Sequence, residues 1–213
     1  MPDRSLSIGE EIANSITHGV GLIASIVALP ILLVKARASS DPSAMQGAAI
    51  FGATLILLYA TSTVYHALPL SKGKRFFRVL DHSAIFLLIA GTYTPFALGP
   101  LRGPWGWTLL AIIWTLALVG IISKVVVGFG IPHLSTGLYL GMGWLIVVAI
   151  KPLIDNVPRA GVLWLAAGGL SYTGGVVFYA MKRVRYHHMI WHLFVAAGSA
   201  CHYVAVLGYA IPA

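Results

Sequence analysis

Long apolar runs separated by short polar segments dominate the hydrophobic pattern of this 213-residue chain. Runs such as ILLYATSTVYHAL and LLAIIWTLALVGII are continuous and do not alternate as exposed strands do. About 20 apolar residues suffice for a helix to cross the hydrocarbon core of a bilayer. The pattern therefore predicts seven transmembrane helices, at residues 12–35, 46–67, 80–99, 105–127, 133–150, 160–181 and 187–210.

Composition supports an all-α integral membrane protein, because 58% of the residues are hydrophobic and only 9% are charged. Seven helices with short connections use nearly the whole chain, so we expect a single seven-helix membrane domain over residues 1–213. Cys201 is the only cysteine, which excludes a disulfide framework and a cysteine-ligated zinc site.

Basic residues are distributed unequally between the two sides of the predicted bundle. Nine of the 14 lysines and arginines fall on the side of the N-terminus. The positive-inside rule then predicts a cytoplasmic N-terminus and an extracytoplasmic C-terminus in the cell's inner (plasma) membrane. We attribute the net charge of +8 to contact with anionic lipid headgroups and predict no nucleic-acid partner. No obligatory protein partner is evident. The nine residues are Arg4, Lys72, Lys74, Arg75, Arg78, Lys124, Lys182, Arg183 and Arg185, most of them assigned to loops.

Polar and ionisable residues, which are costly inside a bilayer, gather at the predicted cytoplasmic ends of four helices. The opposite side has only Asp41, Asp155 and scattered bases in its loops. Because the four helix ends lie at one membrane level, their side chains can form one site. The set comprises Glu11, Asn14 and His18 in the first helix, Ser62 and His66 in the second, Asp81 and His82 at the head of the third, and His187, His188 and His192 in the seventh.

The stretch HHMIWH places three histidines within six residues. His188 and His192 are four apart and share a helix face, whereas His187 points about 100° away and is predicted to lie at the membrane interface. His202 lies about 15 Å deeper along the same helix and cannot join the same ligand set. The spacing therefore favours the pair His188 and His192.

A third histidine at matching depth, His66, completes a candidate metal site with His188 and His192. Neutral imidazoles suit zinc, and three protein ligands leave a position for water, as in catalytic zinc sites. We predict Zn²⁺ on these three residues near the cytoplasmic side, with Asp81 holding a water molecule.

These residues resemble the progestin and adipoQ receptor family, particularly its bacterial hemolysin III branch. The resemblance is carried by Ser62-x-x-x-His66, by Asp81, and by His188-x-x-x-His192, and the opening Glu11-x-x-Asn14-x-x-Thr17-His18-Gly19 also matches. It covers essentially the whole chain. It implies an adiponectin-receptor-like zinc fold, distantly related to alkaline ceramidases, in which Asp81 and Ser62 act beside the metal.

The function expected from this site is zinc-dependent hydrolysis of an amide or ester bond in a membrane lipid, as part of membrane homeostasis. Asp81 would orient a water molecule or accept its proton, and Ser62 would hydrogen-bond Asp81 or the developing oxyanion. A non-catalytic membrane sensor with structural zinc and a pore-forming hemolysin are the alternatives. Glu11, Asn14 and His18 either hydrogen-bond the site or only tie the first helix to the bundle.

Overall fold

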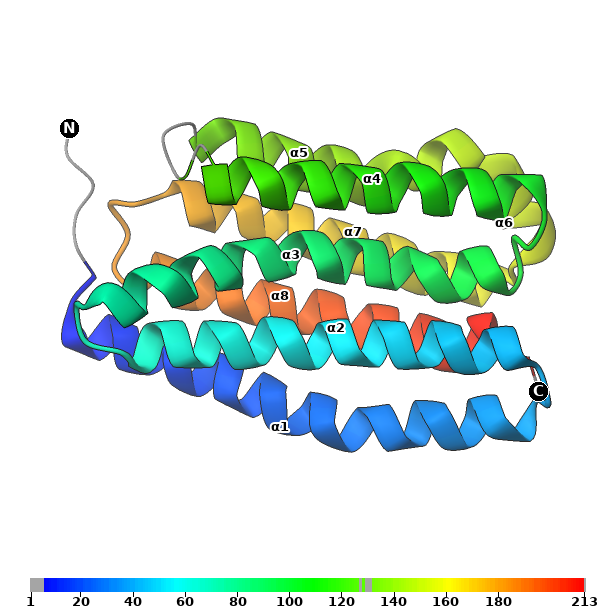
Figure 1. The fold of residues 1–213 in the computed structure, drawn as a ribbon, viewed down its shortest axis with the longest axis horizontal. Helices are drawn as coiled ribbons and strands as arrows, with labels where there is room; N and C mark the ends of the chain where they lie inside the picture. Colours follow the sequence, from blue (N-terminus) through cyan, green and yellow to red (C-terminus); the bar gives the residue numbers. More distant parts are fainter. Residues whose placement is uncertain (1–5, 127, 129–131, 213) are drawn as a thin grey trace.

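The structure, a computed structural model, describes residues 6–126, 128 and 132–212, and within these ranges every regular element is helical. Seven helices among the described residues are long and apolar enough to cross a membrane. They form a bundle in which α1 begins at one end and the last helix finishes at the other (Figure 1). The first four are α1 (Ile8–Ala38), α2 (Pro42–Ala67), α3 (Lys72–Leu98) and α4 (Pro104–Val126).

The fifth and seventh spans are not continuous α-helices. The fifth consists of α5 (Pro132–Trp144), the 3₁₀ segment η1 (Leu145–Ala149) and α6 (Ile150–Asn156). The sixth is α7 (Arg159–Ala180), and the seventh is α8 (His187–Ala205) continued by the π-helical turn η2 (Val206–Ala210). The fifth span therefore ends at residue 156, six residues beyond the predicted end at residue 150.

The third helix begins eight residues earlier than hydropathy predicted. Ser71 caps α3 by accepting a hydrogen bond from the Lys74 backbone N–H, which satisfies a helix-terminal donor. The basic residues between 72 and 78, predicted as a loop, are helical, and Asp81 lies in the third turn of α3 and not at its head. Lys124, also predicted in a loop, is buried within α4. Arg4 and residue 127, both named in the predictions, lie outside the described residues.

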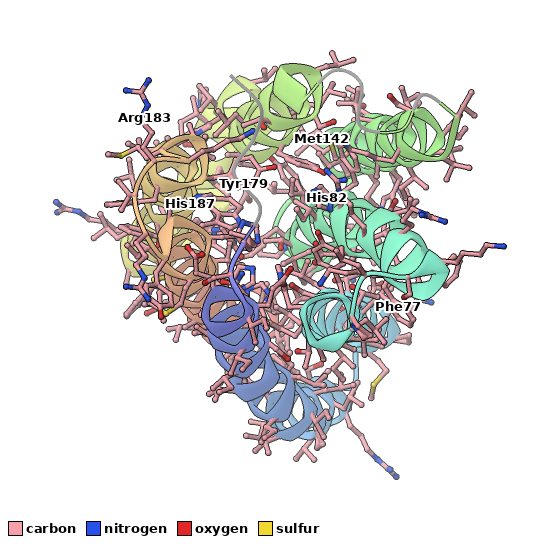
Figure 2. The ribbon with its side chains drawn as sticks, turned by 90° about the vertical axis from the view of Figure 1, so that its left-hand side faces the viewer. Phe77, His82, Met142, Tyr179, Arg183 and His187 are labelled. Carbon is pink, nitrogen blue, oxygen red and sulfur yellow. The ribbon has the colours of Figure 1, made fainter. Side chains whose placement is uncertain are left out.

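Helices that are far apart in the sequence lie side by side around the interior of the bundle. α1 packs against both α2 and α8, while α3 packs between α2 and α4. Figure 2, seen from the end at which α1 begins, shows His82 of α3 and Tyr179 of α7 on opposite sides of this interior. We call this end, which carries Ile8, Ala67 and His187, the histidine end.

An ion pair ties two connections together at the other end. Asp41 caps α2 by accepting a hydrogen bond from the Ser43 backbone N–H, and it also accepts one from Arg102 at 2.6 Å. The Ser43 N–H and the Arg102 guanidinium lower the pKa of the Asp41 carboxyl below its ordinary value.

Candidate metal centre

Three histidines from two helices meet at the histidine end. One ring nitrogen from each of His66, His188 and His192 lies within 4.8 Å of the other two. His66 stands in the last turn of α2, and the other two stand one turn apart on α8. His66 and His192 are buried, with 3% and 2% of their surface exposed, and His188 is partly buried. The structure thus brings together the three predicted ligands, although metal binding itself stays a prediction.

Glu11 of α1 determines how the His66 ring is oriented. The His66 Nδ1 lies 2.6 Å from a Glu11 carboxylate oxygen, whose partner oxygen accepts from Lys74 at 3.0 Å. Because a carboxylate only accepts, Nδ1 carries the proton and donates it to Glu11. The longer 3.5 Å contact between Nδ1 and the Asn14 amide nitrogen is then not a hydrogen bond, since both atoms are donors. This leaves the His66 Nε2 with its lone pair.

The backbone of α1 orients His192 in the same way. The His192 Nδ1 lies 3.2 Å from the Asn14 carbonyl oxygen and therefore donates to it, with the Thr17 hydroxyl nearby at 3.3 Å. Ligating histidines in metal proteins usually donate their other ring N–H to a carboxylate or a backbone carbonyl. Both patterns occur here, on His66 and His192. Their Nε2 atoms are consequently the ones available to a metal.

An unpaired nitrogen on His66 also indicates that the three histidines fit a zinc ion. The His66 Nε2 is buried and has no hydrogen-bond partner among the described residues. A buried polar atom without a partner costs about 1–3 kcal/mol, so native proteins keep few of them. A metal ion shared with His188 and His192 would satisfy that lone pair.

His18 of α1 adds a fourth imidazole that cannot ligate in the same way. Its ring stacks on His192 with centroids 3.5 Å apart and an interplanar angle of 12°. Among the described residues, His18 is outside the group of ring nitrogens that could share one ion, and its ring lies parallel to that of His192 at stacking distance. His18 therefore supports His192 from the side, without sharing its ion. Glu11 and the Asn14 carbonyl thus hydrogen-bond candidate ligands, whereas His18 contacts His192 by stacking alone.

Asp81 and Ser62, the predicted water-holding residues, occupy different positions around the cluster. Asp81 lines the same cavity as His188 and His192. One of its carboxylate oxygens lies 3.3 Å from the His82 Nδ1, but that nitrogen lies closer to the Arg78 carbonyl oxygen, at 2.9 Å. The Asp81 carboxylate therefore retains capacity to accept another hydrogen bond. Ser62 is fully buried one turn before His66, and its hydroxyl has no partner within the described part of the chain.

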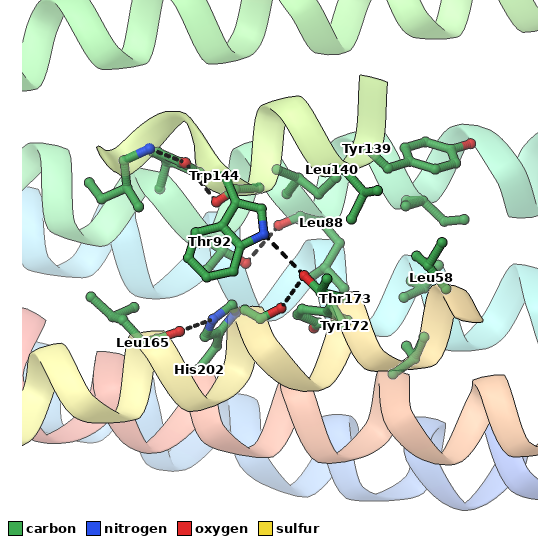
Figure 3. Close-up of a pocket in the computed structure, with 18 of the residues that line it drawn as sticks. Leu58, Leu88, Thr92, Tyr139, Leu140, Trp144, Leu165, Tyr172, Thr173 and His202 are labelled. Carbon is green, nitrogen blue, oxygen red and sulfur yellow. Dashed lines mark hydrogen bonds between the residues drawn. The ribbon is translucent and has the colours of Figure 1, made fainter. Parts of the chain in front are cut away.

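An apolar cavity of about 230 Å³ extends from the histidines into the bundle. Its walls come from α1, through His18, and from α2, α3, the fifth span, α7 and α8, and most of the lining residues are aliphatic or aromatic (Figure 3). A mostly apolar cavity with a small number of polar groups is typical of pockets that bind small molecules.

Two residues at this end were missed by sequence reasoning. Glu10 is 1% exposed, joins a capping box with Ser7 and accepts a hydrogen bond from the Tyr186 backbone N–H, which ties α1 to the start of α8. The pattern Ser7-x-x-Glu10 was the signal that could have revealed it. Lys74 was treated as a loop charge, but its ammonium is paired with Glu11 and donates to the Leu68 carbonyl oxygen.

His187, predicted to lie at the membrane interface, packs within the protein, and its depth in the membrane stays a prediction. It is 8% exposed and buried at the first position of α8. The prediction considered only the angle from His188 and not the neighbouring segment, and the chain turns into α8 through a left-handed Tyr186 with φ of 59°. His187 is nevertheless outside the group of nitrogens that could share one ion.

The Glu11 contact leads to a specific expectation for metal affinity. We expect Glu11→Gln to weaken zinc binding about 10–100-fold, because the His66 ring loses the charged acceptor that fixes its tautomer. Competition with a zinc chelator of known affinity measures the change. Asp155→Asn, which alters an exposed carboxyl of α6 that pairs with Lys151, serves as the matched control. Equal zinc affinities for the two variants would contradict the orienting role of Glu11.

A seven-helix membrane bundle with three histidines grouped at one end defines the class of protein. A model of the family described as haemolysin-III related matches residues 6–203. The chain is 50% identical to Hemolysin-3 of Bacillus cereus, over 96% of this chain and 94% of that protein, and 46% identical to the Hemolysin-3 homolog of Bacillus subtilis (strain 168), over 96% of each. It is 31% identical to the human monocyte to macrophage differentiation factor, over 94% of this chain and 84% of that protein. The chain belongs to the haemolysin III family, which confirms the resemblance noted from its motifs.

Proposed function

We propose that this haemolysin III family protein binds zinc through His66, His188 and His192 and hydrolyses an amide or ester bond of a membrane lipid, in the service of membrane homeostasis. The observation that carries the proposal is the cluster of ring nitrogens within 4.8 Å at the end of an apolar cavity. The excess of basic residues favours a cytoplasmic location for this end, in the inner (plasma) membrane.

When bound, zinc with an open position lowers the pKa of a coordinated water to about 7 and polarises a carbonyl group. The chain supplies the remaining steps. Asp81, on the cavity wall, orients the attacking water and accepts its proton. The buried Ser62 hydroxyl, which has no partner among the described residues, would donate a hydrogen bond to Asp81 or to the developing oxyanion during the reaction. The apolar walls hold the acyl chain and exclude bulk water from the reacting bond.

The substrate class follows from the same cavity. Its aliphatic and aromatic lining favours a hydrocarbon chain over a soluble metabolite. A lipid can enter from the surrounding bilayer, and its polar linkage then lies beside the histidines.

Metal removal tests this proposal directly. The purified protein is reconstituted in vesicles that contain either an N-acyl amide lipid or a phospholipid ester, and released fatty acid is measured by mass spectrometry. We expect release that stops after chelation, returns with added zinc and does not return with magnesium. If zinc-loaded protein released no fatty acid from either lipid, the result would contradict the proposed hydrolase activity. It would favour a non-catalytic membrane protein with structural zinc.

A further inference from the structure

Lys74, near the start of α3, connects the three helices that meet around His66. The residue is only 8% exposed, although its charge is typical of a surface position. A lysine is almost never fully buried in a protein unless its ammonium is paired. The acceptors around this ammonium therefore show what the lysine does.

The ammonium carries three protons, and three oxygen atoms lie within hydrogen-bond distance of it. Two are carbonyl oxygens at the end of α2, that of Tyr65 at 3.1 Å and that of Leu68 at 3.0 Å. The third is a carboxylate oxygen of Glu11 on α1, at 3.0 Å. The ammonium also stands over the Tyr65 ring, 4.9 Å from its centroid. Each proton thus has an acceptor, and the ammonium is held in one place.

The two carbonyl contacts fix the turn of α2 that carries His66. The carbonyl groups of the last helical turn lack partners within the helix, and a lysine side chain can supply one. The Tyr65 carbonyl would ordinarily accept from the N–H of residue 69, but Pro69 has no N–H. Lys74 supplies the missing donor from the neighbouring helix.

The third contact fixes the carboxylate that orients the His66 ring. One oxygen of Glu11 accepts from the His66 Nδ1 at 2.6 Å, and the other accepts from Lys74. The Glu11 side chain is only 22% exposed, and a largely buried carboxylate without an opposite charge is costly. Without the ammonium, the carboxylate would gain by turning towards water and away from the His66 ring.

We propose that Lys74 is a positioning residue of the metal centre. The carbonyl groups at the end of α2 fix its ammonium, and the ammonium holds the Glu11 carboxylate against the His66 ring. Because Glu11 then keeps the proton on Nδ1, the Nε2 of His66 stays available to a metal. The inference rests on the proposed function only in taking this metal as zinc. It adds a residue of α3 to a centre whose candidate ligands come from α2 and α8.

Lys74→Met tests this role, because it removes the charge and the three protons but keeps an unbranched side chain. We expect zinc affinity to fall about tenfold, at the lower end of the about 10–100-fold range for residues that orient a ligand. Competition with a zinc chelator measures the change. Lys72→Met, which removes an exposed charge two residues earlier on α3, is the matched control and should keep the parent affinity. Unchanged zinc affinity in Lys74→Met would overturn the inference.

A double-mutant cycle with Glu11→Gln separates positioning from general support of the fold. If Lys74 acts through Glu11, adding Lys74→Met to Glu11→Gln should change zinc affinity by less than about twofold. An equal loss in both backgrounds would show that Lys74 only supports the bundle, which also contradicts the inference. If Lys74→Met does not fold, Lys74→Gln takes its place in the cycle with the same expectations, because it keeps N–H donors for the carbonyl groups but carries no charge.

The His66 ring gives a second readout that needs no metal. In metal-free protein with isotope-labelled histidine, the proton on the His66 Nδ1 gives an NMR signal, identified by its absence in His66→Asn. We expect this signal in the parent chain and in Lys72→Met, and its loss in Lys74→Met. Loss of the signal in a protein whose parent binds no zinc would support the positioning of His66 and contradict the proposed function. A signal that persists in Lys74→Met contradicts the inference, whatever the zinc content of the parent.

Discussion

Purified His188→Ala and His192→Ala variants should each lose nearly all bound zinc. Each substitution removes one of three nitrogens that lie within 4.8 Å of one another, and the two that remain cannot hold the ion against a competing chelator. The loss should exceed the about 10–100-fold effect expected when a ligand keeps its place but loses its orienting partner. Elemental analysis by mass spectrometry gives the zinc-to-protein ratio directly.

His187→Ala provides the matched control for these variants. It removes a buried imidazole from the same turn of α8 but lies outside the group that could share an ion. We expect it to keep the zinc content of the parent protein. Size-exclusion profiles of all three variants in detergent establish that the bundle is intact. Undiminished zinc in both His188→Ala and His192→Ala would refute the ligand assignment.

Asp81→Asn should abolish lipid hydrolysis while zinc is retained. The amide has nearly the shape of the carboxylate but cannot accept a proton from the attacking water, and general-base catalysis typically contributes 10²–10⁴-fold to the rate. The three candidate ligands are untouched, so the zinc-to-protein ratio should be that of the parent. Rates of fatty-acid release in reconstituted vesicles measure the effect.

Asp155→Asn again serves as the control, because this carboxyl lies on α6 and pairs with Lys151. It should hydrolyse lipid at the parent rate. Full activity in Asp81→Asn would remove the proton-accepting role and leave the metal alone to account for catalysis. Loss of zinc together with activity would instead indicate that Asp81 stabilises the metal site itself.

The number of membrane-spanning helices could be predicted from the sequence. A long continuous apolar run in a bilayer must form its backbone hydrogen bonds within the segment, and a helix does so. Helix ends did not follow as well. Hydropathy placed the start of the third helix at residue 80, where the apolar run begins, whereas the structure starts α3 at Lys72. The helix extends because Ser71 caps it and because Lys74 finds acceptors, including Glu11, and neither effect is visible in a hydropathy profile.

The candidate ligands could be grouped in advance because helical periodicity and membrane depth are both readable from a sequence. Membrane depth and helix face could not predict which atoms of α1 contact the imidazole rings of His66 and His192. The contacts of Glu11 with His66 and of the Asn14 carbonyl with His192 depend on how α1 lies against both α2 and α8. Backbone acceptors carry no residue signature, so the second contact has no trace in the sequence. The same limit applies to the burial of His187, which follows a left-handed Tyr186 at the start of α8.

The division of the histidine cluster between α2 and α8 has a consequence for biogenesis. Helices enter the membrane in the order of synthesis, and α8 is the last of them. His66 therefore enters the membrane on the second span, while five further spans among the described residues are still to be inserted. The complete set of nitrogens exists only once the final hairpin of α7 and α8 has docked beside α1. The metal centre that we propose can therefore be completed only at the end of assembly, and a chain that stalls before its last helix would lack two of its three candidate ligands.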